Sequence, residues 1–257
     1  MRSPASNLAE NVANLGSLKY NMEQMSRRFG GKMIDSGFVG RSRQRWDEWA
    51  DGWNKNPRRM ALNDEIVASA IEQLGPPPQH VLDAGCGSGC YARWLTERGY
   101  QVTATDQAPR MVALAQAEIG ALSGICHVGD LSALAYPISY FDAVVALTVI
   151  EWVADPVRSV QELARVTRPG GRISLGVLGA GSQVRDRAYR RFYGAEVMNT
   201  VMPWEAARML TENGWRVTDQ RGVYRDRHPP ELIEQLDERL RMCAAFIWFI
   251  GAVRRSG

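Results

Sequence analysis

Short apolar runs alternate with segments of helical apolar spacing through the middle of the chain. The apolar runs predict strands at 80–84, 101–105, 125–128, 141–147 and 172–177. The helical spacing predicts helices at 91–98, 109–118 and 156–167. Strands and helices that alternate in this way build a parallel sheet with helices on both faces. Ligands bind such sheets at the carboxyl ends of the strands.

The pattern changes on both sides of this core. Residues 203–213 and 229–243 predict helices, and 215–218 and 246–253 predict two more strands. Between the core and these elements, the segment 182–194 is both basic and aromatic. On the amino-terminal side, amphipathic helices are expected at 15–29 and, after Asn63 as a cap, up to residue 74. Residues 32–44 have no clear period and are expected to form a hinge-like linker.

Residues 46–53 place three tryptophans on one face of a further predicted helix. Trp46, Trp49 and Trp53 are spaced i, i+3 and i+7. Three indoles on one short helix provide a large apolar surface. Core packing and the wall of a binding pocket are both compatible with this pattern.

The first predicted core strand runs into a glycine loop, V-L-D-A-G-C-G-S-G at 81–89. Glycine permits sharp turns and lets a ligand approach the backbone. The next strand ends on Asp106, whose carboxylate can accept both hydroxyls of a ribose. The spacing is D-x-G-x-G-x-G, with Cys90 after the last glycine, whereas a dinucleotide site has G-x-G-x-x-G. The nicotinamide interpretation is therefore disfavoured.

This loop, joined to the strand-end acid, resembles that of the class I S-adenosylmethionine-dependent methyltransferases. The resemblance implies a Rossmann-like α/β fold: a mostly parallel seven-stranded sheet with an antiparallel last strand. An N-terminal helical extension or lid would occupy 1–75 and the S-adenosylmethionine-binding domain 76–257, with a substrate-recognition insert at about 180–200. The product would be S-adenosylhomocysteine.

The resemblance also implies the residues that hold the cofactor. Asp83 and the loop backbone would face its amino-acid end, Asp106 its ribose and Met111 its adenine. Asp130 would accept the adenine amino group, and the backbone of Leu131 would meet a ring nitrogen. The full set of expected cofactor residues is Asp83, Gly85, Cys86, Gly87, Asp106, Gln107, Met111, Asp130, Leu131, Leu147 and Thr148.

The acceptor side is less defined by the sequence. Many members of the family that this sequence resembles have a histidine, able to act as a base, near the position of Trp152. This sequence has a tryptophan there, so no catalytic base is assigned. The acceptor would carry an ionised or easily ionised group, or Glu151 or Tyr189 would assist. The residues expected to contact the acceptor are Trp49, Trp53, Trp152, Arg185, Tyr189 and Tyr193.

Three functions are compatible with these motifs. The preferred function is methyl transfer to an oxygen or nitrogen atom of a small molecule, such as a secondary metabolite. Carbon and sulfur are less favoured as acceptor atoms. The segments I-E-W-V-A-D-P at 150–156 and R-P-G-G at 168–171 also resemble the methyltransferases that esterify carboxymethoxyuridine in tRNA. Basic flanks around an acidic centre fit that alternative, although no RNA-binding module is recognisable. A noncatalytic cofactor-binding subunit is the third possibility.

Composition limits the number of domains, the metal and disulfide content and the cellular location that are expected. A chain of 257 residues with 45% hydrophobic residues can build one α/β domain with an extension. Its four cysteines lack zinc-ligand spacing, so neither a metal nor a disulfide framework is expected. No apolar run reaches the roughly 20 residues of a membrane span. A cytoplasmic protein without a membrane partner, monomeric or homodimeric, is expected.

Overall fold

The computed structural model describes residues 36–53, 66–77, 79–120, 125–193, 198–224 and 230–256. The chain divides into two units, Met1–Gly37 and Phe38–Gly257, and the fold described below is that of the second. The predicted helix at 15–29, the Asn63 cap and His228 lie outside the described residues.

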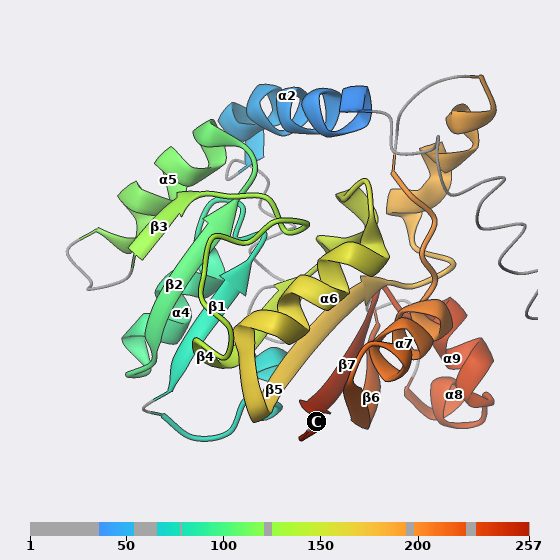
Figure 1. Cartoon of the computed structure of the whole chain (residues 1–257). Coiled ribbons are helices and arrows are strands. Elements are labelled where there is room, and N and C mark those ends of the chain that lie inside the picture. The colour runs from blue at the N-terminus through green and yellow to red at the C-terminus, as the bar shows by residue number, and fades with distance from the viewer. Residues whose placement is uncertain are drawn as a thin grey trace, which may run out of the picture. The chain divides into compact units, whose positions relative to one another are not determined.

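Seven strands form one sheet in the order β3-β2-β1-β4-β5-β7-β6 (Figure 1). Six strands run parallel to one another, and β7 runs antiparallel to both of its neighbours, β5 and β6. The bounds are β1 His80–Ala84, β2 Gln101–Asp106, β3 Ile125–Val128, β4 Phe141–Leu147, β5 Thr167–Leu178, β6 Trp215–Val223 and β7 Ile247–Arg254. The predicted sheet and its antiparallel last strand are confirmed.

Alternate residues of the central strands pack on opposite faces of the sheet. Val81 of β1 and Val145 of β4 lie in one buried cluster, whereas Leu82 and Val144 lie in another. A strand buried on both faces requires apolar side chains at successive positions, which is why these segments appear in the sequence as continuous apolar runs.

Helices cover both faces. The 66–72 helix, α4 (Cys90–Glu97) and α5 (Pro109–Ile119) contribute to the cluster that contains Val81. The helices α6 (Pro156–Val166) and α7 (Pro203–Glu212) pack on the opposite face. In α6, Pro156 occupies the first turn and the carboxylate of the N-cap Asp155 accepts the backbone N–H of Arg158. The two layers bury the centre of the sheet.

Two predictions about local structure are wrong. The helix α2 spans Ser36–Trp53, so residues 36–44 continue the predicted tryptophan helix instead of forming a linker. Ser42 and Ala50 are buried on the core, and these tertiary contacts supply an order that the aperiodic sequence does not predict.

The second error is the single helix predicted at 229–243. The chain forms α8 (Pro230–Glu234) and α9 (Glu238–Ala244) instead. Asp237 separates them, since its carboxylate accepts the backbone N–H of Leu240 and begins the second helix. The basic and aromatic segment forms a 3-10 helix, η2 (Gln183–Tyr193).

No helix among the described residues is long and apolar enough to cross a bilayer.

Candidate functional site

The glycine loop leaves the carboxyl end of β1 and needs residues without a side chain. Gly85, Gly87 and Gly89 all have positive φ. A Cβ on Gly85 would lie 2.2 Å from Val149 Cγ2, and one on Gly89 would lie 2.7 Å from Ala115 Cα. The loop is therefore packed between the segment after β4 and α5, and glycine is required at both positions because a side chain would clash there.

Asp106 at the end of β2 holds the loop in place. Its Oδ2 accepts the N–H of Gly87 at 3.0 Å, and its Oδ1 accepts the N–H of Ala108 at 2.9 Å. Burial raises the pKa of Asp106. Each carboxylate oxygen keeps a lone pair beyond these bonds, which suits the two hydroxyls of a ribose.

Asp83 is an almost completely buried carboxylate at the edge of this loop, with 1% of its surface exposed. Burial, and after it the charge of Asp106, raises the pKa of Asp83 to about 7. Its Oδ2 has no hydrogen-bond partner among the described residues. A buried, unpaired carboxylate oxygen is destabilising by itself, and a cationic group of a ligand would compensate it.

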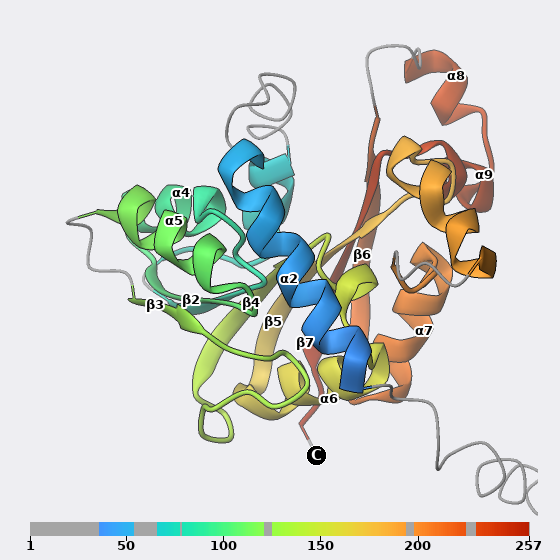
Figure 2. The same ribbon diagram turned by 90° about the horizontal axis from the view of Figure 1, so that it is seen from above.

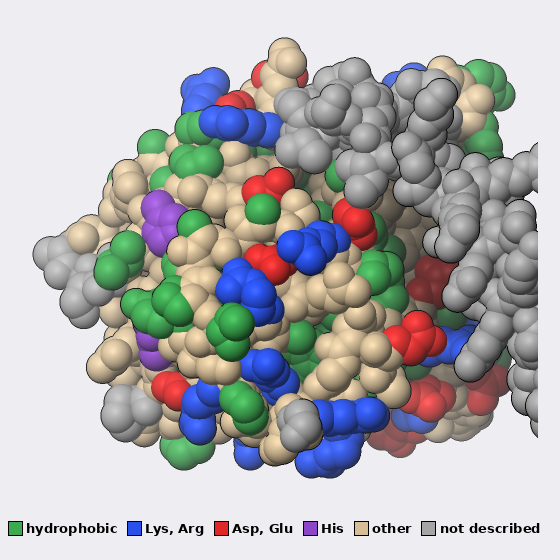
Figure 3. Space-filling model, viewed as in Figure 1, with side chains coloured by type: hydrophobic (Ala, Val, Ile, Leu, Met, Phe, Trp, Pro, Cys, Tyr) green, Lys and Arg blue, Asp and Glu red, His purple; other side chains and the backbone are tan. Residues whose placement is uncertain are grey.

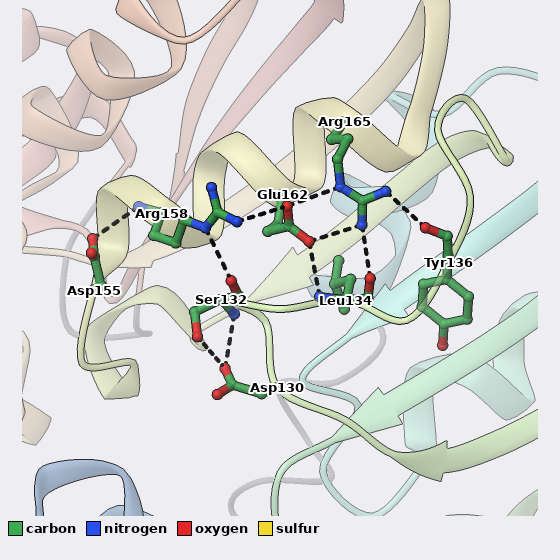
Figure 4. A network of polar contacts seen from close by, with 8 residues as sticks. All are labelled: Asp130, Ser132, Leu134, Tyr136, Asp155, Arg158, Glu162 and Arg165. Carbon is green, nitrogen blue, oxygen red and sulfur yellow. Dashed lines mark hydrogen bonds and ion pairs between the residues drawn. The ribbon is translucent and has the colours of Figure 1, made fainter. Parts of the chain in front are cut away.

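A third acid follows β3. Asp130 Oδ1 accepts both the N–H and the hydroxyl of Ser132 at 2.8 Å, and Leu131 is buried beside it. A Cβ on the preceding Gly129 would lie 2.3 Å from Thr105 Oγ1, so the chain passes close to β2 here. Figure 4 shows Asp130 at one end of a polar network that reaches α6.

The segment after β4 closes the opposite side of the loop. Leu147 is buried at the strand end, and Thr148 has a φ of 50°. Left-handed backbone is unfavourable for a β-branched residue and is found at functional sites when the surrounding structure enforces it. The N–H of Thr148 donates to the carbonyl of Gly176 at 2.7 Å, which provides that constraint.

Helix α2 lies over these strand ends, above the sheet in Figure 1 and across β4 and β5 in Figure 2. Ser42 Oγ donates to the carbonyl of Trp152 and accepts the side-chain amide of Gln107, both at 3.1 Å. Ala50 packs against Ala108 and the fully buried Met111. The predicted cofactor residues Gln107 and Met111 thus also hold the helix that covers the site.

Two tryptophans of α2, Trp46 and Trp49, meet Trp152 of the segment after β4. The ring centroids of Trp46 and Trp49 are 5.3 Å apart, those of Trp46 and Trp152 are 5.0 Å apart, and all contacts are edge-to-face. Trp49 remains 45% exposed. The structure brings together two of the predicted acceptor residues and adds Trp46, which only its place in the tryptophan pattern indicated. The side chain of Trp53 lies outside the described residues.

Buried polar groups fix the backbone around Trp152. Glu151 is fully buried, its Oε1 accepts the N–H of Leu178, and burial raises its pKa to about 6. Asn199 donates its side-chain amide to the carbonyls of Ile150 and Val153, at 2.7 and 2.8 Å. The sequence offered no signal for Asn199, since it acts from a segment almost fifty residues away.

The predicted acceptor residues of η2 occupy two different environments. Arg185 binds the carbonyls of Leu178, Gly179 and Val201, so its guanidinium joins β5 to a later loop. Tyr189 and Tyr193 are 55% and 84% exposed and contact each other edge-to-face. These tyrosines therefore lie on the surface, while Ala188 packs in the same buried cluster as Trp152.

The two histidines among the described residues make contacts elsewhere in the sheet and are not assigned as a base at this site. His80 opens β1, at the opposite end of the strand from the glycine loop, and contacts Thr103 Oγ1. His127 lies in β3, and its Nε2 is 2.6 Å from the hydroxyl of Tyr136. The third, His228, is outside the described residues.

Comparison with known proteins now adds to this geometry. Residues 82–175, which contain the loop and all three strand-end acids, match the family model described as a methyltransferase domain. These residues form a methyltransferase domain of the class I S-adenosylmethionine-dependent type. The predicted family and its cofactor are confirmed.

Curated relatives match only part of the chain. It is 37% identical over 128 residues to the malonyl-[acyl-carrier protein] O-methyltransferase of Serratia marcescens, covering 49% of each chain. It is 31% identical over 168 residues to the ubiquinone biosynthesis O-methyltransferase of Xanthomonas oryzae pv. oryzae, covering 62% of this chain and 65% of the relative. The chain therefore spans less than two thirds of the length of either relative.

Solved structures share the fold. The methyltransferase in the complex with the Haloferax volcanii Trm112 methyltransferase activator superposes with a TM-score of 0.62 at 21% identity. The match covers 82% of this chain and 98% of that one. At this identity the likeness concerns the fold alone, and it agrees with the sheet order described above.

Proposed function

We propose that this methyltransferase transfers the methyl group of S-adenosylmethionine to an oxygen atom of a small molecule. The observation that carries the proposal is the convergence of Asp83, Asp106 and Asp130 around a glycine-rich loop at the carboxyl ends of β1, β2 and β3. The two relatives named above are both O-methyltransferases, which supports oxygen over the other acceptor atoms considered.

The residues fit the proposed cofactor. The unpaired Oδ2 of Asp83 suits the ammonium of the methionine moiety, and the carboxylate of Asp106 suits the ribose hydroxyls. Asp130 and the backbone of Leu131 would meet the adenine edge. When bound, S-adenosylmethionine supplies an electrophilic methyl group and a neutral thioether as leaving group.

The protein's contribution is alignment and exclusion of water. The tryptophans Trp46, Trp49 and Trp152 would form the apolar wall beside the reacting atoms, and Ser42 holds α2 over them. With Trp152 in place of a histidine, an acceptor oxygen that is already ionised or acidic, a carboxylate or an acidic phenol, is favoured. The Serratia relative's name includes a malonyl group, and such a carboxylic acid belongs to this class.

The other functions receive less support. The named relatives are not tRNA methyltransferases, and Lys/Arg and Asp/Glu side chains are interspersed on the face shown in Figure 3. A noncatalytic subunit would have no need for the strained Thr148 backbone at the reaction site. Small-molecule methylation therefore remains the proposal, with the oligomeric state left open between monomer and homodimer.

Two measurements test the proposal. Calorimetry with S-adenosylhomocysteine should detect one site per chain, and a protein that binds neither this product nor S-adenosylmethionine would contradict the proposal. Transfer of a radiolabelled methyl group should then be screened against carboxylic acids, phenols, amines and tRNA. Activity confined to amines or to tRNA would overturn the choice of a small-molecule oxygen acceptor.

A further inference from the structure

The loop that carries Asp130 is fastened to α6 by an ion-pair cluster (Figure 4). Glu162 lies at the centre of this cluster and is buried, with 4% of its surface exposed. Its carboxylate is 2.8 Å from Arg165 Nη2, and its Oε1 is 3.6 Å from Arg158 Nη2. An unpaired charge in the interior is strongly destabilising, so a buried carboxylate requires a charged partner. The two arginines provide this partner for Glu162.

All three side chains bind the backbone of the loop at every second residue. Arg158 Nε donates to the carbonyl of Ser132 at 3.3 Å, and Glu162 Oε2 accepts the N–H of Leu134 at 2.9 Å. Arg165 donates to the carbonyls of Leu134 and Tyr136, at 2.7 and 2.8 Å. Backbone bonds of this kind fix the path of a loop whatever its side chains are.

The constraint continues to Asp130. Ser132 is held through its carbonyl by Arg158, and its N–H and hydroxyl both bind Asp130 Oδ1. Among the described residues, no group binds Asp130 Oδ2, so this oxygen is left to accept a hydrogen bond from a ligand. A continuous series of contacts thus connects Glu162 and its arginines to Asp130 Oδ1. The other oxygen of this carboxylate, Oδ2, is the one proposed to meet the adenine.

Electrostatics keep the cluster charged. The hydrogen bond from Arg165 outweighs burial and, with the N–H of Leu134 and the charge of Arg158, lowers the pKa of Glu162. The carboxylate is therefore ionised throughout the neutral range, and charge-assisted bonds of this kind are stronger than neutral ones.

We propose that Glu162 is a positioning residue for adenine recognition, which holds Asp130 Oδ2 in place through Arg158, Arg165 and the 130–136 loop. The inference rests on the proposed function, since it takes the ligand to be S-adenosylmethionine. Glu162 contacts no part of the cofactor; it determines how well the loop discriminates the adenine amino group from other purine substituents.

The test compares two ligands by calorimetry: S-adenosylhomocysteine and S-inosylhomocysteine, whose purine carries a 6-oxo group in place of the amino group. Wild-type protein should prefer the first. Glu162→Gln keeps the volume of the side chain but removes its charge. It should weaken binding of S-adenosylhomocysteine about tenfold and binding of the inosyl analogue by about threefold or less, so that the preference falls.

Two variants act as controls. Glu97→Gln also breaks an Arg–Glu pair on a helix, the exposed pair Arg93–Glu97 of α4, and should leave both affinities unchanged. Arg158→Gln removes a half-exposed arm of the cluster, so it keeps the test open if Glu162→Gln does not fold. It should lower the preference about twofold to threefold.

A double-mutant cycle checks the route of the effect. In an Asp130→Asn background, Glu162→Gln should have little further effect on S-adenosylhomocysteine binding, because both changes act on the same contact. Additive effects, equal weakening of both ligands, or no change in affinity would each overturn the inference. Failure of the wild-type protein to bind S-adenosylhomocysteine would contradict the proposed function instead.

Discussion

At the scale of single residues, the two acids nearest the glycine loop have different surroundings and are expected to serve different purposes. Asp106 accepts two backbone N–H groups and is stabilised by them. Asp83 is buried with an unpaired oxygen and a pKa raised to about 7. Asp106 fixes the conformation of the loop, whereas the ionised form of Asp83 is destabilised in the absence of a ligand.

Asp106→Asn should weaken S-adenosylhomocysteine binding by about 2–3 kcal/mol. The amide would place an NH2 group against the N–H of Gly87 or Ala108 and lose half of its acceptor capacity. Calorimetry measures the affinity, and circular dichroism verifies the fold. Asp219→Asn, at an exposed site on β6, is the matched control. Equal affinities for wild type and Asp106→Asn would exclude the ribose role.

Asp83 links stability to pH. Because its folded pKa is raised to about 7, its contribution to stability is fully present below its unfolded pKa and is lost as pH rises toward and through about 7. In ligand-free protein at pH 8, Asp83→Asn should therefore raise the melting temperature by about 3 °C. The same change should remove most of the ligand affinity, as expected where stability is given up for function.

Thermal melts at pH 5 and pH 8 provide the check. The stabilisation should shrink at pH 5, where Asp83 is already protonated and neutral. An Asp83→Asn protein that is less stable than wild type at pH 8 would show that the carboxylate is paired in solution, contrary to this account.

At the scale of elements, α2 is attached to the site through Ser42 and, at the start of α5, through contacts of Asp47 and Asp51 with Arg110. The hydroxyl of Ser42 both donates to Trp152 and accepts from Gln107, and the carboxylate of Asp47 accepts the N–H of Arg110 at the start of α5. A surface helix held by such side-chain links opens locally at a lower free energy than the core does.

Ser42→Ala should speed amide exchange across 42–53 about fivefold, since it removes one net hydrogen-bond contribution of about 1 kcal/mol. Exchange in β1 and β4 should not change. Gln44→Ala is the control, because Gln44 is exposed and its side-chain amide donates to Glu48 of the same helix. Unchanged exchange in α2, or acceleration spread over the sheet, would contradict a local attachment through Ser42.

At the scale of the whole molecule, β7 joins the edge strand β6 to the rest of the sheet. It lies between β5 and β6 and places Phe249 and Ile250 on opposite faces, both fully buried. The last strand of the chain therefore completes both hydrophobic clusters, and the fold depends on the carboxyl-terminal residues.

Phe249→Ala should lower the free energy of unfolding by about 3–5 kcal/mol, the usual effect of removing a buried phenylalanine. Urea titration followed by circular dichroism measures this change. Val184→Ala, at a site that is 37% exposed, should shift the midpoint little. A loss below about 1 kcal/mol for Phe249→Ala would contradict a central role for β7.

Local sequence determined most of the core. The strands from β1 to β4 begin and end within a residue of their predicted bounds, because their apolar runs are bounded by polar and turn residues. The glycine loop and its following acid were equally visible, since positive φ and a strand-end carboxylate depend on neighbours in the chain.

Only the tertiary structure decided what covers and supports the site. Ser42 and Trp152 are 110 residues apart, and Leu134 and Glu162 are 28 apart, so neither contact leaves a local pattern. The order of α2, the division between α8 and α9 and the fastening of the Asp130 loop depend on such contacts. The sequence alone thus determined the methyl donor's binding motif, whereas folding decided how that motif is enclosed, because enclosure depends on side chains that meet only in three dimensions.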